Sequence, residues 1–170
     1  MNKLFSTLAM LACLALSACA SPATETPSAA AGETNLAEFE GVRVTLVSFG
    51  APMAGEHKAQ ALYTVLNGTT HNTTIEASLP DELKTVLQEA LAASPQDVYV
   101  ILYAGPQPSS GYALQIDDVK LNGNDLQITY RIAPPPPSTG AATVITHPYV
   151  LLRVSGPKAA DLNVTFTEAK

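Results

Sequence analysis

Apolar and polar side chains alternate over several short stretches of this chain, which is the pattern of β-strands that bury one face. Residues 42–46, Val-Arg-Val-Thr-Leu, show the alternation clearly. Residues 98–103 differ, because they form a continuous apolar run whose length is typical of a strand buried on both faces. On these grounds, strands are predicted at residues 42–46, 61–66, 98–103, 149–154 and 162–166.

A β-hairpin is predicted around Asn122-Gly123, because both central residues of a type I′ turn need a positive φ. Apolar residues alternate cleanly over its second arm, residues 126–132. Over its first arm, residues 112–121, the apolar phase shifts by one position. A β-bulge is therefore expected near Asp117-Asp118, an acidic pair that we expect to be solvated rather than to hold a cation.

One segment has the apolar spacing of a helix. Apolar residues recur at i, i+3, i+4, i+7 and i+8 from Leu83 to Leu91. Ser78 is a candidate cap, Pro80 is expected in the first turn, and Ser94-Pro95 ends the pattern. The elements together predict a mainly β, α+β fold: an antiparallel β-sandwich or partly open barrel with one amphipathic helix.

The first residues have the pattern of a bacterial lipoprotein signal. The apolar run 4–16 follows Met-Asn-Lys and is shorter than the about 20 residues that a membrane-spanning helix needs. Small residues then precede a cysteine in Leu16-Ser17-Ala18-Cys19, as in a lipobox. The pattern predicts a signal peptide at residues 1–18 and a mature chain anchored by acyl groups such as palmitate on Cys19. The alternative is an ordinary cleavable signal in which the cysteine occurs by chance.

Small, polar and proline residues without apolar periodicity fill residues 19–38, which predicts a disordered tether. Residues 39–170 have the size of a single globular domain. Ala20-Ser21 stand where lipoproteins of the inner membrane have an aspartate. The resemblance to lipoproteins therefore implies a cell-envelope protein on the outer membrane, facing the periplasm.

Composition and charge argue against several classes of function. The chain has 9 basic and 15 acidic residues, a net charge of −6, which disfavours nucleic acid as a partner. Its two cysteines, Cys13 and Cys19, lie in the signal and at its end, so no disulfide is expected within the domain. No serine-hydrolase, phosphate-loop or zinc-peptidase motif occurs, and His57, His71 and His147 are not at metal-ligand spacing. We predict no enzyme activity, no catalytic residue, no metal and no cofactor.

Residues 98–154 contain a characteristic series of strands and loops. An apolar strand ends near Gly105, a loop closes on Ser109-Ser110-Gly111-Tyr112, prolines follow the hairpin at 134–137, and Thr146-His147-Pro148 leads into the last apolar strand. This arrangement resembles the C-terminal domain of PrcB-like proteins, in which the loop is typically Thr-Gly-Gly-Tyr. That family is named for a lipoprotein subunit of an extracellular protease complex. The resemblance implies a non-catalytic protein that binds, and stabilises, an extracytoplasmic protease.

Two loops are candidates for the contact with such a partner. Gly111 permits a left-handed backbone, and proline restricts both Pro148 and the residue before it. If the loops lie together at one rim of the sandwich, they form a protein-binding edge; otherwise they are ordinary loop architecture. The candidate partner-binding residues are Pro108, Ser109, Ser110, Gly111, Tyr112, His147, Pro148 and Tyr149.

Two alternatives remain open at the level of sequence. The same loops are similar, more distantly, to those of chagasin-type peptidase inhibitors, although the asparagine, arginine and tryptophan of that family's loops are missing here. A small-ligand carrier would instead require a large cavity inside the β domain.

Overall fold

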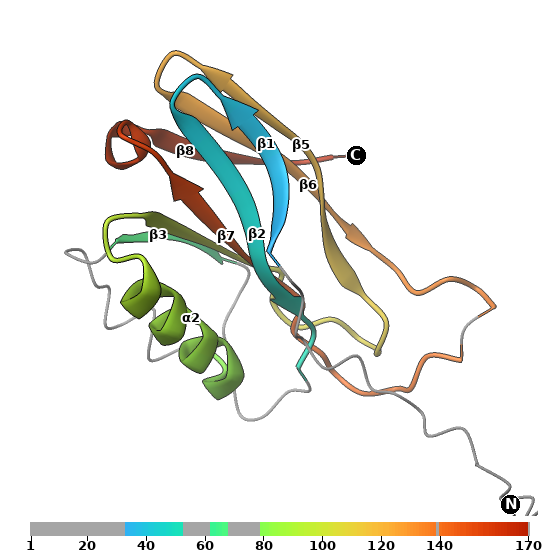
Figure 1. Ribbon diagram of the computed structural model, residues 1–170. Coiled ribbons are helices and arrows are strands. Elements are labelled where there is room, and N and C mark those ends of the chain that lie inside the picture. Colours follow the sequence, from blue (N-terminus) through green and yellow to red (C-terminus); the bar gives the residue numbers. More distant parts are fainter. Residues whose placement is uncertain (1–32, 53–61, 68–78, 139, 170) are drawn as a thin grey trace, which may run out of the picture.

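The computed structural model describes residues 33–52, 62–67, 79–138 and 140–169 (Figure 1). In the described part of the chain, α-helix α2 and two sheets form three layers, with the larger sheet in the middle. The elements are β1 (Thr34–Phe39), β2 (Val42–Gly50), β3 (Leu62–Asn67), α2 (Asp81–Ala93), β4 (Val98–Tyr103), β5 (Ala113–Asn122), β6 (Asp125–Ala133), β7 (Tyr149–Ser155), the 3₁₀ helix η1 (Ala159–Asp161) and β8 (Asn163–Glu168).

The five-stranded sheet has the order β1-β2-β7-β4-β3 and is antiparallel throughout. The three-stranded sheet has the order β5-β6-β8. The predicted mainly β fold with one helix is confirmed, and the open sheets make it a sandwich rather than a barrel. One pairing departs from the antiparallel expectation, because β8 lies parallel to β6.

Strand β4 separates two cores. All six of its residues are buried, as the continuous apolar run predicted. Successive side chains of a strand point to opposite faces. Tyr99, Ile101 and Tyr103 therefore pack with the buried leucines of α2, while Val98 and Val100 pack with Leu126 and Ile128 of the second sheet.

The predicted helix is confirmed as α2, and its buried residues are Leu83, Leu87 and Leu91. Pro80 is the N-cap residue rather than part of the first turn, and no side chain caps this end. Ser78 lies outside the described residues. At the other end, the Tyr99 hydroxyl donates a hydrogen bond to the Ala90 carbonyl over 2.6 Å, which fixes the helix to β4.

The hairpin and its bulge are present, with one shift. Asn122 pairs with Asp125, so Gly123 and Asn124 are the central residues of the turn, one position later than predicted. Gly123 has a φ of +62°, and Gly-Asn suits such a turn as well as Asn-Gly does. The register shifts between Ile116 and Asp118, which confirms the bulge.

The N-terminal boundary of the domain requires a correction. Residues 34–38 were assigned to the tether, but Thr34–Phe39 form strand β1 at the edge of the central sheet. The prediction was wrong because an edge strand needs little apolar periodicity when its backbone pairs with a neighbour. Leu36, Ala37 and Phe39 also pack against the second core. The rest of the tether, the signal and Cys19 lie outside the described residues, as do His57 and His71.

No helix among the described residues has the length and hydropathy needed to span a membrane.

Candidate functional site

The two predicted loops lie at the same end of the sandwich, which we call the loop end. Strands β2, β4 and β6 finish there, and β5 and β7 start there (Figure 1). The loop end comprises the described loop residues 51–52, 104–112 and 134–148.

The structure brings the two loops into direct contact. Gln107 and Thr146 form an antiparallel bridge: the Gln107 amide donates to the Thr146 carbonyl over 2.8 Å, and the Thr146 amide donates back over 3.1 Å. The Thr146 hydroxyl donates a further hydrogen bond to the Ser109 carbonyl over 3.0 Å. The sequence did not single out Gln107 for this role, since a lone bridge has no periodic signal.

Ser110 fastens the first loop to the segment that precedes β7. Its amide donates to the Ala142 carbonyl over 2.9 Å, and its hydroxyl accepts a hydrogen bond from the Ala142 amide over 2.8 Å. Gly111 follows with a φ of +91°, and a Cβ atom there would lie 2.8 Å from the Cβ atom of Pro135. Because side chains rarely adopt this φ and the space is filled, glycine is required at this position.

His147 and Pro148 are buried beneath the loops instead of standing at their surface. The exposed fraction of His147 is 2%. Its ring stacks on that of Tyr103, with centroids 5.5 Å apart, and its amide donates to the Pro52 carbonyl. The Pro148 carbonyl accepts a hydrogen bond from Ala104, which ties the second loop to the end of β4.

Tyr149 is also buried, and its hydroxyl lies 3.3 Å from the Ser48 hydroxyl in a buried hydrogen bond. Gly50 is its partner across β2 and β7, and a Cβ atom at Gly50 would lie 3.0 Å from the Tyr149 ring. His147, Pro148 and Tyr149 therefore hold the loop end in place from beneath, and their side chains are not part of its exposed surface.

Burial also determines the protonation of these tyrosines. It raises the pKa of Tyr103 to about 12. Burial raises the pKa of Tyr149 as well; the bond to Ser48 opposes that shift and the negative charge of Glu82 adds to it. Both hydroxyls therefore stay neutral at physiological pH, and neither acts as a base there.

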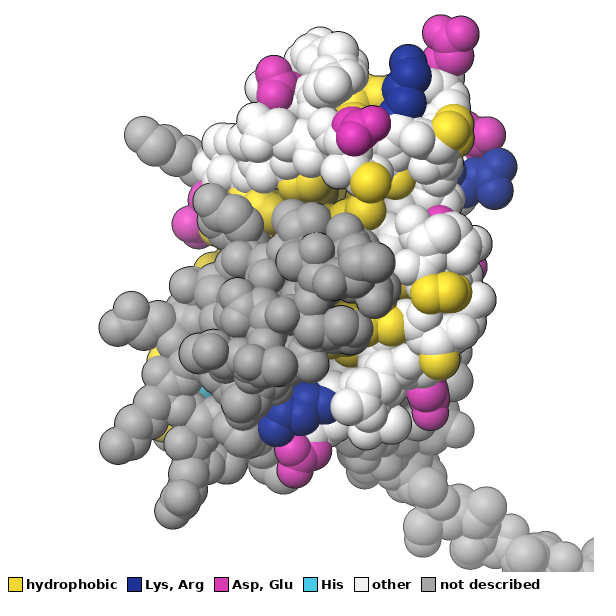
Figure 2. Space-filling model, turned by 90° about the vertical axis from the view of Figure 1, so that its left-hand side faces the viewer, with side chains coloured by type: hydrophobic (Ala, Val, Ile, Leu, Met, Phe, Trp, Pro, Cys, Tyr) yellow, Lys and Arg dark blue, Asp and Glu magenta, His cyan; other side chains and the backbone are white. Residues whose placement is uncertain are grey.

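The described residues of the loop end expose an uncharged surface, much of it from residues 134–145. Pro108 and Gly111 are exposed, Ser109, Ser110 and Tyr112 are partly exposed, and Ile145 has an exposed fraction of 53%. Residues 98–116 and 132–152 contain no aspartate, glutamate, lysine or arginine. On the side of the molecule shown in Figure 2, by contrast, basic and acidic side chains are scattered among uncharged ones.

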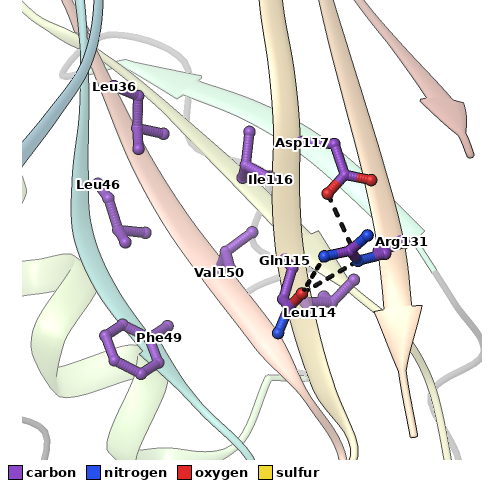
Figure 3. A pocket seen from close by; sticks show the side chains of 9 residues that line it. All are labelled: Leu36, Leu46, Phe49, Leu114, Gln115, Ile116, Asp117, Arg131 and Val150. Carbon is purple, nitrogen blue, oxygen red and sulfur yellow. Dashed lines mark hydrogen bonds and ion pairs between the residues drawn. The ribbon is translucent and has the colours of Figure 1, made fainter.

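A groove of about 340 Å³ opens between the two sheets (Figure 3). Apolar side chains of both sheets line it, including Leu36, Phe49 and Ile116, and Phe49 is about half exposed at 49%. The groove is at the lower limit of ligand-pocket volumes, and the space between the sheets is otherwise filled by the second core. This arrangement gives little support to the ligand-carrier alternative.

The acidic pair at the bulge is engaged by neighbouring cations. Asp117 forms an ion pair with Arg131 over 3.4 Å, while the Arg131 guanidinium donates to the Gln115 side chain (Figure 3). A hydrogen bond from Lys120 holds the pKa of Asp118 below its usual value. The described residues contain no group of three potential metal ligands.

Comparison with known proteins finds one similarity. Residues 98–155 match the family model described as PrcB C-terminal, which confirms the resemblance predicted over residues 98–154. The match covers about a third of the chain and runs from β4 to β7, so it includes both loops. No curated protein and no solved structure matches the chain.

Proposed function

We propose that this protein is a lipid-anchored, non-catalytic envelope lipoprotein that binds, and stabilises, an extracytoplasmic protease or protease complex. The match of residues 98–155 to the PrcB C-terminal family carries the proposal, since that family is one of accessory proteins in a protease complex. The lipobox at Leu16-Ser17-Ala18-Cys19 supports acylation of Cys19 and a place on the outer membrane, facing the periplasm.

We place the contact with the partner on the exposed side of the loop end, from Pro108 to Tyr112 together with Ile145. The Gln107–Thr146 bridge and the bonds between Ser110 and Ala142 hold these residues in one conformation. A surface that is ordered before binding loses less conformational entropy when the complex forms. Its lack of charge suits a contact that excludes water rather than one guided by long-range attraction.

The geometry favours this function over peptidase inhibition. An inhibitor of the chagasin type inserts two loops into a peptidase, and the second loop here would be Thr146-His147-Pro148-Tyr149. All four residues are buried in the described structure. The second loop therefore has no exposed side chains to insert.

The test is affinity capture from native envelopes with the mature chain, residues 20–170, produced without its lipid. Capture of a protease by the native chain is expected, and Pro108→Glu is expected to abolish it by placing a charge in the contact. Gln127→Glu is the matched control, because it adds the same charge at an exposed position of β6. If the native chain captures no protease, the proposed partner is wrong. If both variants capture it equally, the proposed contact surface is wrong.

A further inference from the structure

Four consecutive prolines, Pro134 to Pro137, follow β6 and belong to neither sheet. At this point the ribbon leaves both sheets and projects outward (Figure 1). Strand β6 ends at Ala133, and a single proline is sufficient to stop a strand because it cannot donate a ladder hydrogen bond. The end of the strand therefore does not account for the whole run of prolines.

The backbone of this run has little conformational freedom. Proline fixes φ at about −65°, and a residue that precedes proline is restricted to extended values of ψ. Both restrictions apply to residues 134–136, because each is a proline followed by a proline. These residues lie in neither a helix nor a strand. The run is therefore a short polyproline II segment, with three residues per turn.

The exposure of the four side chains agrees with a threefold geometry. Pro134 and Pro137 are one turn apart and share a face, at a separation of about 9 Å, and both are exposed. Pro136 is exposed on a second face, whereas Pro135, on the third, is half-buried. One face of the segment therefore rests on the domain, and the other two are open to solvent.

Gly111 is the residue on which the third face rests. A Cβ atom at Gly111 would lie 2.8 Å from the Cβ atom of Pro135 and 3.7 Å from its Cα and Cγ atoms, so the proline ring occupies the space that a side chain would need. The segment is also held at its start, where Ala133 pairs with Ala113. A ligand that is already held in its bound conformation loses less entropy when it binds.

The chemistry of the segment determines which groups can bind it. Proline has no N–H group, so residues 134–137 present apolar rings and carbonyl acceptors but no backbone donor. Tryptophan and tyrosine match both features, because each has a ring that can stack on proline and an N–H or O–H group that can donate to a carbonyl. Grooves lined by such side chains bind segments in which two prolines are three positions apart, as Pro134 and Pro137 are.

We propose that Pro134 to Pro137 is a recognition segment that docks into a groove of the partner protein lined by tryptophan or tyrosine side chains. The inference rests on the proposed function in one respect, since it takes the loop end as the contact with a protein partner. It extends that contact across Gly111 to Pro134 and Pro137. It also specifies the partner's side of the contact: aromatic rings that carry hydrogen-bond donors.

Affinity capture from native envelopes with the unlipidated mature chain tests the segment. The double variant Pro134→Ala with Pro137→Ala removes both rings of one exposed face, and it is expected to weaken capture of the partner about tenfold or more. Pro157→Ala is the matched control, because it removes an exposed proline between β7 and η1, and it is expected to leave capture unchanged. Equal capture by the native chain and the double variant overturns the inference.

A peptide of residues 133–138 separates loss of the contact from loss of folding. This peptide is expected to displace the native chain from the captured partner, because a run of prolines keeps the polyproline II conformation by itself. The same peptide with alanine at positions 134 and 137 is expected to displace much less. If the two peptides compete equally, the inference is wrong.

Nuclear magnetic resonance of the chain with isotope-labelled proline reports on the aromatic groove directly. Protons that lie over the face of an aromatic ring shift upfield, so the signals of Pro134 and Pro137 are expected to move upfield when the purified partner is added. The signals of Pro157 are expected to stay in place. Formation of the complex without an upfield shift would mean that the groove is not aromatic, and would overturn the inference.

The outcomes distinguish this inference from the proposed function. If the native chain and the double variant capture the same protease equally, the proposed function stands and the recognition segment is wrong. If the chain binds a protein other than a protease, with the peptide competition and the upfield shifts described, the segment stands and the proposed protease is wrong. If the chain captures no protein, both are wrong.

Discussion

Tyr103 and Tyr149 lie directly opposite each other on β4 and β7, and removal of their hydroxyl groups is expected to change stability in opposite directions. Their exposed fractions are 0% and 1%. The Tyr149 hydroxyl shares a hydrogen bond with Ser48, whereas the Tyr103 hydroxyl has no hydrogen-bond partner among the described residues. The perturbation is Tyr→Phe at each position, which removes one oxygen atom and leaves the ring packing unchanged.

The expected magnitudes follow from these contacts. A neutral hydrogen bond contributes about 1 kcal/mol, and a buried polar group left without a partner costs about 1–3 kcal/mol. Tyr149→Phe removes the bond and leaves the buried Ser48 hydroxyl unpaired, so it is expected to lower the free energy of unfolding by about 1–2 kcal/mol. Tyr103→Phe removes a buried hydroxyl that makes no hydrogen bond within the described residues, so it is expected to raise the free energy of unfolding by about 1 kcal/mol.

The assay is unfolding by urea, followed by circular dichroism, for the native chain and both variants. With a slope of about 2 kcal/mol per molar urea, the two variants are expected to differ by about 1 M or more in midpoint. Equal slopes of the free energy of unfolding against urea concentration mean that the three proteins expose the same surface on unfolding, so their midpoints can be compared. If Tyr103→Phe were destabilising like Tyr149→Phe, the Tyr103 hydroxyl would have a partner and the account of this end of the core would be wrong.

Three further predictions concern the same structure. Gly111→Ala is expected to cost at least about 1 kcal/mol more than Gly123→Ala, because both positions have a positive φ but only the first meets Pro135; equal losses in urea unfolding would contradict the packing of the loop. Leu87 is 1% exposed in the core between α2 and the central sheet, so Leu87→Ala is expected to lower the free energy of unfolding by about 2–5 kcal/mol. An unchanged free energy of unfolding would mean that α2 does not cover the sheet. Stability is expected to fall as the pH rises from about 10 to about 12. Burial raises the pKa of Tyr103 to about 12 in the folded protein, so over this range its hydroxyl ionises in the unfolded chain but stays neutral in the folded one. Thermal unfolding measured across this pH range should show a smaller decline for Tyr103→Phe than for the native chain.

The elements that could be predicted from the sequence are those whose signals are local. The apolar stripe of α2, the apolar run of β4 and the phase shift at Asp117 each depend on neighbouring residues. Strand β1 could not be predicted, because its pairing with β2 and not its own side-chain pattern makes it a strand. The parallel pairing of β8 with β6 was missed for the same reason, since Asp125 and Asn163 are far apart in the chain.

The sequence predicted which two loops lie together, but not which of their residues are buried. The two loops were expected to meet if they shared a rim, and the Gln107–Thr146 bridge shows that they do. A proline-tyrosine pair that anchors a loop has the same local sequence pattern as one that is exposed, so the burial of Pro148 and Tyr149 could not be predicted. Pro148 and Tyr149 are buried because β7 begins in the middle of the central sheet, where both faces are covered.

The bulges in β1 and β5 have a further consequence, for aggregation. Both strands are at the edge of their sheets, and a straight edge presents a row of free backbone groups to which another molecule can add a strand. The register shifts between Asn35 and Ala37 in β1 and between Ile116 and Asp118 in β5 interrupt that row, and ion-paired side chains flank the second interruption. The bulges therefore discourage a second molecule from adding a strand at β1 or at β5. The opposite edges, β3 and β8, pair with their neighbours without a register shift, so strand addition between two molecules is expected there first.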